Sequence, residues 1–301
     1  MHGMRDVSYH VVDVFTTTPL QGNGLAVFPD GSGLETAMMQ SIARELNLSE
    51  TTFILPRESN AEATRVRIFT PARELAFAGH PTIGTAYVMR RLGLVADSAK
   101  RFVLSENVGA VPIRVDEGDD PILWLTTPQI SWLGEFARER CAATLSLEEE
   151  RLVPDVPCEQ LSAGSPLIII PVRNREAVDA SRLDARAYAD LVNECTEPTA
   201  IFLFAPTPEG AYSRMFAPEF GIVEDPATGG ATGPLAAFMM KHGLASSKDG
   251  TRFFSEQGVK IGRRSVLHVL INGERGEGGI EIGGNAVHVA EATMHVPEAG
   301  R

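Results

Sequence analysis

The 301-residue chain has little cysteine and no excess of positive charge. Its three cysteines, Cys141, Cys158 and Cys195, show no close spacing, so the sequence predicts neither a disulfide framework nor a zinc knuckle. Lysine and arginine number 27 against 39 acidic residues, a net charge of −12. Nucleic acid is therefore not an expected partner, because a phosphate backbone requires a clustered positive surface.

Long apolar runs are also missing. The first ten residues, MHGMRDVSYH, lack the apolar core of a signal peptide, and apolar runs such as residues 167–170 are far shorter than a membrane span. We therefore expect a cytoplasmic protein without membrane contact.

The chain does contain enough apolar residues, 44%, for about two domains. Short β-branched and aromatic runs between turn residues predict strands, and apolar residues spaced by four predict helices. Strands are expected at residues 10–15, 25–28, 51–55, 65–69, 101–104, 111–115, 122–126, 167–172, 200–205, 214–217, 265–272 and 286–289, and helices at 34–46, 81–91, 185–193 and 233–242. The polar stretch 131–157, with its acidic run at 148–150, is the predicted boundary between domains.

One short pattern occurs twice. FAGHPTIGTA at 77–86 and VEDPATGGA at 223–231 share [His or Asp]-Pro-x-x-Gly-x-Ala, with His80 and Asp225 at the variable position 145 residues apart. Each is preceded by Arg-x-Phe-x-Pro, which starts at Arg67 and at Arg214. The repeat predicts two similar halves related by duplication, each reading strand, loop, ionisable residue, proline, helix.

An ionisable side chain just before a helix lies beside unpaired backbone N–H groups, where an anionic ligand can bind. Two such helix starts would hold a small carboxylate. The alternative is structural: Asp225 as a helix cap and His80 as a buried, hydrogen-bonded residue. The small residues that would allow close approach of the backbone to a ligand are Gly79, Gly84, Gly229 and Gly230.

A third candidate is Glu50 in NLSETTF at 47–53, between a predicted helix end and an apolar strand. A partly desolvated carboxyl group has a raised pKa and suits an acid/base that both takes and gives a proton. The alternative is a surface glutamate at a strand edge.

With these residues assembled, the chain resembles the phenazine-biosynthesis PhzF-like family of isomerases. The likeness is carried by VDVFTTTPLQGNGLAVF at 12–28, IARELNLSETTFIL at 42–55, RIFTPARELAFAGHPTIGTA at 67–86 and SRMFAPEFGIVEDPATGGATGPLA at 213–236. It implies an α+β fold of the diaminopimelate epimerase type: two similar lobes, each a mixed or antiparallel sheet around a central helix, with the active site in the cleft between them. The expected first lobe is 1–130, with residues from about 285 to 301 as its candidate completion, and the second is 131–284.

The resemblance also implies roles for single residues. Glu50 would be the catalytic acid/base, and His80 and Asp225 would complete the polar site. The implied reaction isomerises a small carboxylate-bearing substrate, best known as a dihydro-hydroxyanthranilate, by proton transfer without metal or organic cofactor, in a homodimer. The implied substrate-binding residues are Gly79, Gly229, Gly230, Asn23 and Thr228.

Three departures bear on these expectations. Neither repeated pattern contains cysteine, whereas the epimerase relatives present one cysteine at each helix start, so a single-carboxylate proton shuttle is favoured over a two-thiol racemase. Gly24 replaces the proline of the usual GNP, which we expect to loosen a turn, and Gly230 replaces a serine of the phenazine-pathway members. An epimerase or racemase of an amino-acid-like substrate, and a non-catalytic relative that binds a metabolite, are the alternatives.

Overall fold

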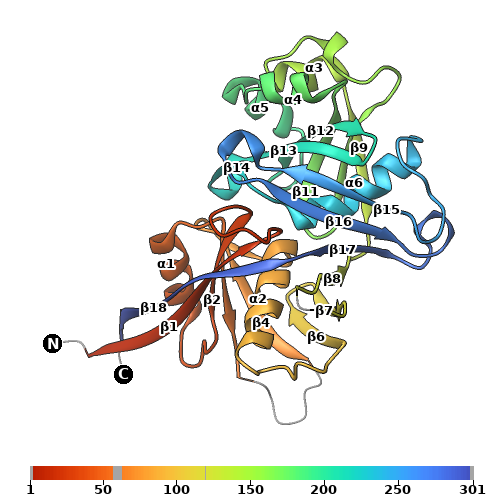
Figure 1. The fold of residues 1–301 in the computed structure, drawn as a ribbon. Coiled ribbons are helices and arrows are strands. Elements are labelled where there is room, and N and C mark those ends of the chain that lie inside the picture. Colours follow the sequence, from red (N-terminus) through yellow and green to blue (C-terminus); the bar gives the residue numbers. More distant parts are fainter. Residues whose placement is uncertain (1–2, 57–62, 119, 299–301) are drawn as a thin grey trace. The chain divides into compact units, whose positions relative to one another are not determined.

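The computed structural model describes residues 3–56, 63–118 and 120–298, which divide into two compact units. The first unit contains the chain up to residue 126 and again from residue 283, and the second contains residues 127–282 (Figure 1). No helix in the described part of the chain is both long and apolar enough to cross a membrane.

The first unit is built on a mixed sheet in the order β18-β1-β2-β3-β4-β6-β7-β8, with the short strand β5 added at one end of β4. Its strands are β1 (Met4–Val14), β2 (Asn23–Phe28), β3 (Glu50–Ile54), β4 (Thr64–Phe69), β5 (Glu74–Leu75), β6 (Arg101–Glu106), β7 (Gly109–Val115), β8 (Leu123–Thr126) and β18 (Ala286–Pro297), and its helices are α1 (Thr36–Leu46) and α2 (Gly79–Arg91).

The second unit has its own mixed sheet in the order β9-β10-β11-β12-β13-β15-β16, with β14 added to β13. Its strands are β9 (Ser131–Phe136), β10 (Cys158–Ser162), β11 (Pro166–Pro171), β12 (Ala200–Thr207), β13 (Gly210–Ala217), β14 (Ile222–Asp225), β15 (Arg252–Gln257) and β16 (Ser265–Ile271). Its α-helices are α3 (Arg138–Thr144), α4 (Arg175–Ala180), α5 (Ala185–Val192) and α6 (Gly229–Lys241), and β17 (Ile280–Gly284) follows at the boundary.

The two sheets repeat one pairing scheme, which confirms the predicted duplication and the α+β fold. From β1 to β7 the successive pairs are antiparallel, parallel, antiparallel, parallel and antiparallel, and the pairs from β10 to β16 follow the same sequence. The first parallel pair places Leu25 opposite Glu50 in one unit and Leu167 opposite Ala200 in the other. These registers define which residues of the two halves are equivalent.

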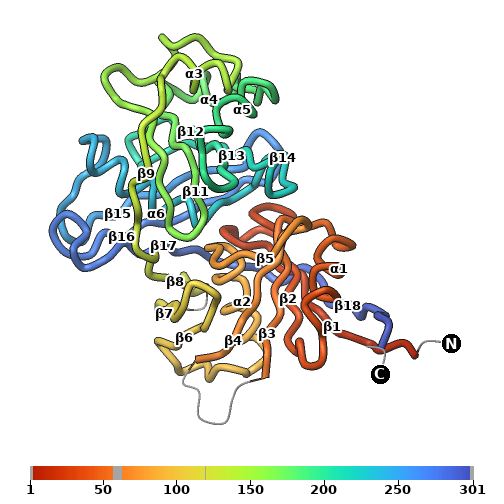
Figure 2. Tube along the Cα trace, turned by 180° about the vertical axis from the view of Figure 1, so that it is seen from behind, coloured from red at the N-terminus to blue at the C-terminus, as the bar shows by residue number. Residues whose placement is uncertain are grey.

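Helices cover both faces of each sheet because successive strand side chains point to opposite faces. In the first unit, Ala26 and Phe28 of β2 and Phe53 of β3 pack with Met39 and other residues of α1. The alternate residues face α2, which contacts β1, β2, β3 and β8, and the tube in Figure 2 follows α2 beside these strands. A buried helix of this kind requires apolar or satisfied polar residues on nearly all sides, and ten of its thirteen residues are buried.

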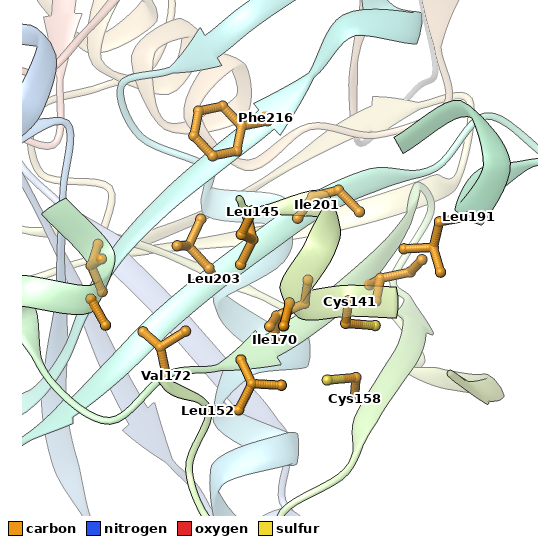
Figure 3. Packing of buried hydrophobic residues seen from close by; sticks show 14 of the residues in the cluster. Cys141, Leu145, Leu152, Cys158, Ile170, Val172, Leu191, Ile201, Leu203 and Phe216 are labelled. Atoms are coloured by element: carbon orange, nitrogen blue, oxygen red, sulfur yellow. The ribbon is translucent and has the colours of Figure 1, made fainter. Parts of the chain in front are cut away.

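The second unit repeats this layering with more helices. Helices α3, α4 and α5 cover one face of the sheet, where Leu145, Ile170, Leu191 and Leu203 form a buried cluster (Figure 3). The face opposite is covered by α6, whose Phe238 packs edge-on against Phe204 of β12 with ring centroids 5.9 Å apart.

Helix starts are where sequence and structure differ. Helix α2 begins at Gly79 instead of residue 81, and α6 begins at Gly229 instead of residue 233. The Gly-Gly pair that opens α6 has low helix propensity, so the sequence does not mark the true start, and Pro234 lies in the second turn of the helix. The stretch 131–157 folds as β9 and α3 inside the second unit.

Candidate active site

Three polar residues of the first unit meet at one end of its sheet. Asn23 opens β2, Glu50 opens β3, and His80 is the second residue of α2. The pleat explains the convergence: Thr52 faces α2, since its hydroxyl lies 2.8 Å from that of Thr85, and Glu50 lies two residues before Thr52 on the same face.

The three side chains form a chain of contacts. The Asn23 amide nitrogen Nδ2 lies 3.2 Å from His80 Nδ1, and His80 Nε2 lies 3.4 Å from Glu50 Oε2. All three are buried, with exposed fractions of 1%, 7% and 2% for Asn23, Glu50 and His80. Because the amide nitrogen can only donate, His80 accepts at Nδ1 and carries its proton on Nε2, which lies 3.4 Å from the carboxylate oxygen but makes no hydrogen bond to it.

Burial also fixes the charge of the imidazole. It lowers the pKa of His80 from 6.5 to about 3, because the cationic form would lose its hydration. At neutral pH, His80 is therefore a neutral hydrogen-bond donor beside Glu50, not a cation.

In the second unit, Asp225 ends β14 and is buried, with 4% of its surface exposed. The hydroxyl of Thr228 donates to Asp225 Oδ2 at 2.5 Å, and Thr228 is the residue before α6. Gln257, which sequence analysis missed, fixes this turn: its Nε2 donates to the Asp225 carbonyl at 2.7 Å, and its Oε1 accepts from the Thr228 amide at 3.1 Å. Gly229 and Gly230 follow as the first two residues of α6.

The repeated pattern does not place His80 and Asp225 at equivalent positions, which corrects the prediction from sequence. Thr82 and Thr232 each bond to the carbonyl four residues earlier, in the first turns of helices that are both 13 residues long. The helices therefore match with an offset of 150, not 145. His80 lies inside α2 and corresponds to Gly230, whereas Asp225 lies four residues before α6.

The Arg-x-Phe-x-Pro repeat has a structural explanation. Arg67 binds Glu74 of β5 through two hydrogen bonds of 2.8 and 2.6 Å, and Arg214 binds Glu224 of β14 through two of 2.9 and 2.8 Å. Each guanidinium also lies about 5 Å from the phenylalanine ring of its own motif (5.0 and 4.9 Å). We call each pair an Arg–Glu clamp. The second clamp holds Glu224, the residue before Asp225. The sequence repeat marked both arginines but not their acidic partners.

We call Asn23, Glu50 and His80 the polar trio. It occurs in one half only. Glu50 corresponds to Ala200 by strand register, and His80 corresponds to Gly230 by helix register. The duplicated scaffold therefore keeps the clamps but presents a carboxylate with an adjacent imidazole on one side alone.

Two glycines have roles other than those expected. A Cβ on Gly84 would lie 2.5 Å from Leu25 Cδ2 and 2.8 Å from Val14 Cγ2, so Gly84 allows close packing of α2 on the sheet rather than ligand approach. Gly24 lies in β2 opposite Asp13, not in a turn, so the expected loosening is wrong. The turn residue is Gly22, with φ of 68°.

Among the described residues, no group of three histidine, cysteine, aspartate or glutamate side chains is arranged to hold a metal ion.

Comparisons with known proteins agree with the fold. A family model described as phenazine biosynthesis-like protein matches residues 12–292. An uncharacterised isomerase of Mesorhizobium japonicum is 36% identical over 97% of this chain and 100% of its own. The trans-2,3-dihydro-3-hydroxyanthranilate isomerase of Pseudomonas aeruginosa is also 36% identical, over 96% of this chain and 99% of its own.

Solved structures give the same result. A PhzF-family phenazine biosynthesis protein of Bacillus anthracis matches with a TM-score of 0.84 at 25% identity, covering 96% of this chain and 99% of the other. A predicted epimerase of Pseudomonas aeruginosa, with the same coverage, gives 0.81 at 32% identity. A hydroxyproline epimerase of Agrobacterium vitis gives 0.70 at 13% identity over 99% of this chain and 94% of the other, a likeness of fold alone.

Proposed function

The chain belongs to the phenazine biosynthesis-like family of isomerases, and from this membership we propose that it moves a proton on a small carboxylate-bearing substrate, with Glu50 as the acid/base and no cofactor. The observation that carries the proposal is the one-sided trio. A carboxylate with a neutral imidazole 3.4 Å away is present in the first unit, and its counterparts Ala200 and Gly230 carry no acid/base.

The chemistry balances with one carboxylate. Glu50 takes a proton from a carbon next to an unsaturated system, and the electron pair left by the C–H bond moves into that system. The carboxylic acid then returns the proton to another carbon, which regenerates the carboxylate. The Nε2–H of His80 can donate to Glu50 or to a developing negative charge on the substrate.

A two-base racemase would be expected to place an acid/base on each half. The positions equivalent to Glu50 and His80 in the second unit are Ala200 and Gly230, so the epimerase alternative rests on Asp225, the buried carboxyl group before α6, and on the likeness to a predicted epimerase. A screen for α-proton exchange over amino acids tests this alternative directly.

The relative from Pseudomonas aeruginosa supplies the first substrate to try, trans-2,3-dihydro-3-hydroxyanthranilate. We expect the protein to incorporate deuterium from heavy water into this compound, measured by NMR. Glu50→Gln should lower the rate by about 10²–10⁴-fold, the usual contribution of a positioned acid/base. Glu45→Gln on the exposed face of α1 is the matched control and should behave as wild type.

Equal rates for wild type and Glu50→Gln would refute the role of Glu50. If a ligand stabilises the protein against heat but no ligand takes up deuterium from the solvent, a non-catalytic metabolite-binding relative is favoured.

Other parts of the proposal rest on the family resemblance. The proposal includes Asp225, a polar group of the second unit, as a site residue. Asp225→Asn in the same deuterium-incorporation assay tests this role. Gly79, Gly229, Gly230, Asn23 and Thr228 stay proposed substrate-binding residues. A homodimer and a cytoplasmic location stay predictions, and sedimentation of the purified chain tests the first.

A further inference from the structure

Glu106 is a buried carboxyl group that the proposed reaction does not use. It ends β6 and is 3% exposed. Its Oε1 lies 2.6 Å from the hydroxyl of Thr82, in the first turn of α2, and its Oε2 is buried without a hydrogen-bond partner. A carboxylate in this position would carry a full charge with one oxygen unsatisfied, which is costly in a protein interior.

A count of protons indicates which group donates. The Thr82 hydroxyl lies 2.8 Å from the Ala78 carbonyl and 2.6 Å from Glu106 Oε1, but it has only one proton. The carbonyl can only accept, so both contacts become hydrogen bonds if Thr82 donates to Ala78 and Glu106 donates to Thr82. That arrangement requires a protonated Glu106.

The duplicated scaffold gives an independent argument. In the parallel pair β4–β6, Arg65 lies opposite Ser105, and in the equivalent pair β13–β15, Tyr212 lies opposite Glu256. Arg65 and Tyr212 are equivalent because each lies two residues before the arginine of its Arg–Glu clamp.

The next residues along β6 and β15, Glu106 and Gln257, are therefore counterparts. Gln257 is a neutral amide that both donates and accepts at the turn before α6. A protonated glutamic acid is the ionisable side chain closest to that amide in shape and hydrogen bonding.

We propose that Glu106 is a neutral carboxylic acid in the folded protein and is the positioning residue for the first turn of α2, which carries Gly79 and His80. Gln257 does the same for the turn that carries Asp225 and Thr228. Only the effect on turnover rests on the proposed function.

Charges near Glu106 are consistent with this assignment. Burial is the largest effect and raises the pKa of Glu106 to about 8, against the hydrogen bond with Thr82 and, among the described charged side chains, the guanidinium of Arg65, which both lower it. His80, in the same turn of α2, adds no charge at neutral pH because burial lowers its pKa.

Infrared spectroscopy tests the protonation directly. We expect the wild-type protein at pH 7 to show a protonated carboxyl C=O stretch that Glu106→Gln lacks, and this band should disappear well above pH 8. A difference spectrum at pH 7 with carboxylate bands alone would overturn the proposal.

Thermal unfolding is the second measurement. The folded protein holds a proton on Glu106 that the unfolded chain releases near the ordinary pKa of 4.5, so the contribution of Glu106 to wild-type stability should fall as pH rises from about 4.5 to 8. We therefore compare the melting temperature of Glu106→Gln minus that of wild type at two pH values. This difference should be several degrees larger at pH 8.5 than at pH 5. A constant deficit at every pH would contradict the proposal. The exposed Glu117→Gln should show a pH-independent difference.

Turnover of the dihydro-hydroxyanthranilate probe is the third. Glu106→Leu should raise KM several-fold at pH 7, and Glu106→Gln should restore it. Wild type should lose activity with an apparent pKa near 8, and Glu106→Gln should lack this alkaline loss. Equal KM values for all three proteins would refute a positioning role. If wild type does not turn over the probe, the substrate proposal fails, and the spectroscopic and thermal results still decide the state of Glu106.

Discussion

At the scale of single residues, His80 shows how one contact determines a chemical role. Asn23 donates to Nδ1, which leaves the proton on Nε2, and burial keeps the ring neutral. The imidazole is therefore a neutral group beside the Glu50 carboxylate and does not pair with it as a cation.

We predict that the His80 ring does not titrate between pH 8 and pH 5. The measurement is nitrogen-detected NMR of the imidazole groups, with His80→Gln to assign the signal among the seven histidines. A titration midpoint near 6.5 would contradict the prediction. The pKa near 3 also means that His80 binds a proton in the unfolded chain that it does not bind in the folded one, so the contribution of His80 to stability should fall as pH drops from about 6.5 toward 3.

Sequence reasoning named Asn23, Glu50 and His80 because family motifs mark them, and the structure brings the three side chains together. It missed Glu106 and Gln257, because each ends a strand and contacts a helix start that is distant in the sequence. Such a contact is visible only in the structure. The counterpart relation became visible only through the strand registers of β6 and β15.

At the scale of elements, the Arg–Glu clamps fix the short strands β5 and β14 to β4 and β13. The Arg214–Glu224 pair is almost fully buried, with side chains 10% and 9% exposed, and Arg214 also donates to the Ser181 carbonyl at 2.8 Å. A buried carboxylate that loses its partner is costly to keep.

We therefore expect Arg214→Met to reduce the free energy of unfolding by about 3–5 kcal/mol. Arg214→Met combined with Glu224→Leu should recover much of this loss, because both charges are then removed. Lys100→Met is the control: its pair with Glu117 is 71% and 79% exposed, so solvent screens it and its loss should change stability little. Urea unfolding measures all three, and an Arg214→Met loss no larger than the control would refute the prediction.

Helix packing gives a second prediction at this scale. Gly84→Ala should destabilise the protein by about 1–3 kcal/mol, because the added methyl group would overlap buried Leu25 and Val14. Gly134→Ala on the exposed strand β9, where a Cβ would meet nothing within 4 Å, is the matched control. Equal melting temperatures for the two variants would show that α2 can move away from the sheet at little cost.

Element types were largely predictable, because alternation and four-residue spacing survive in the sequence: α1 was expected at 34–46 and spans Thr36–Leu46. The offset between halves was not predictable. The shared Pro-x-x-Gly-x-Ala pattern suggested 145, whereas the hydrogen bonds of Thr82 and Thr232 establish 150. A short pattern of small residues can recur by chance, whereas a helix register is fixed by its backbone.

At the scale of the whole molecule, the chain leaves the first unit after residue 126 and returns to it at residue 283. The returning strand β18 pairs with β1 along its length, from Met4 opposite Pro297 to Val14 opposite Ala286. The first unit is therefore assembled from both ends of the described chain.

Removal of residues 286–301 should consequently unfold the first unit and leave the second largely intact. The two tryptophans report the units separately, since Trp124 is 1% exposed in the first and Trp132 is 43% exposed in the second. In a Trp132→Phe background we expect the truncation to shift the emission of Trp124 to longer wavelength. Unchanged Trp124 emission would show that β1 does not need β18.

The same return of the chain affects the order of events during synthesis. All strands and α-helices of the second unit lie before β18, so this unit can leave the ribosome and fold while β1 still lacks its neighbour. Until translation reaches residue 297, the edge of β1 is open, and a nascent chain is exposed there to pairing with the wrong strand. The half that carries Glu50 and His80 is translated first and completed last.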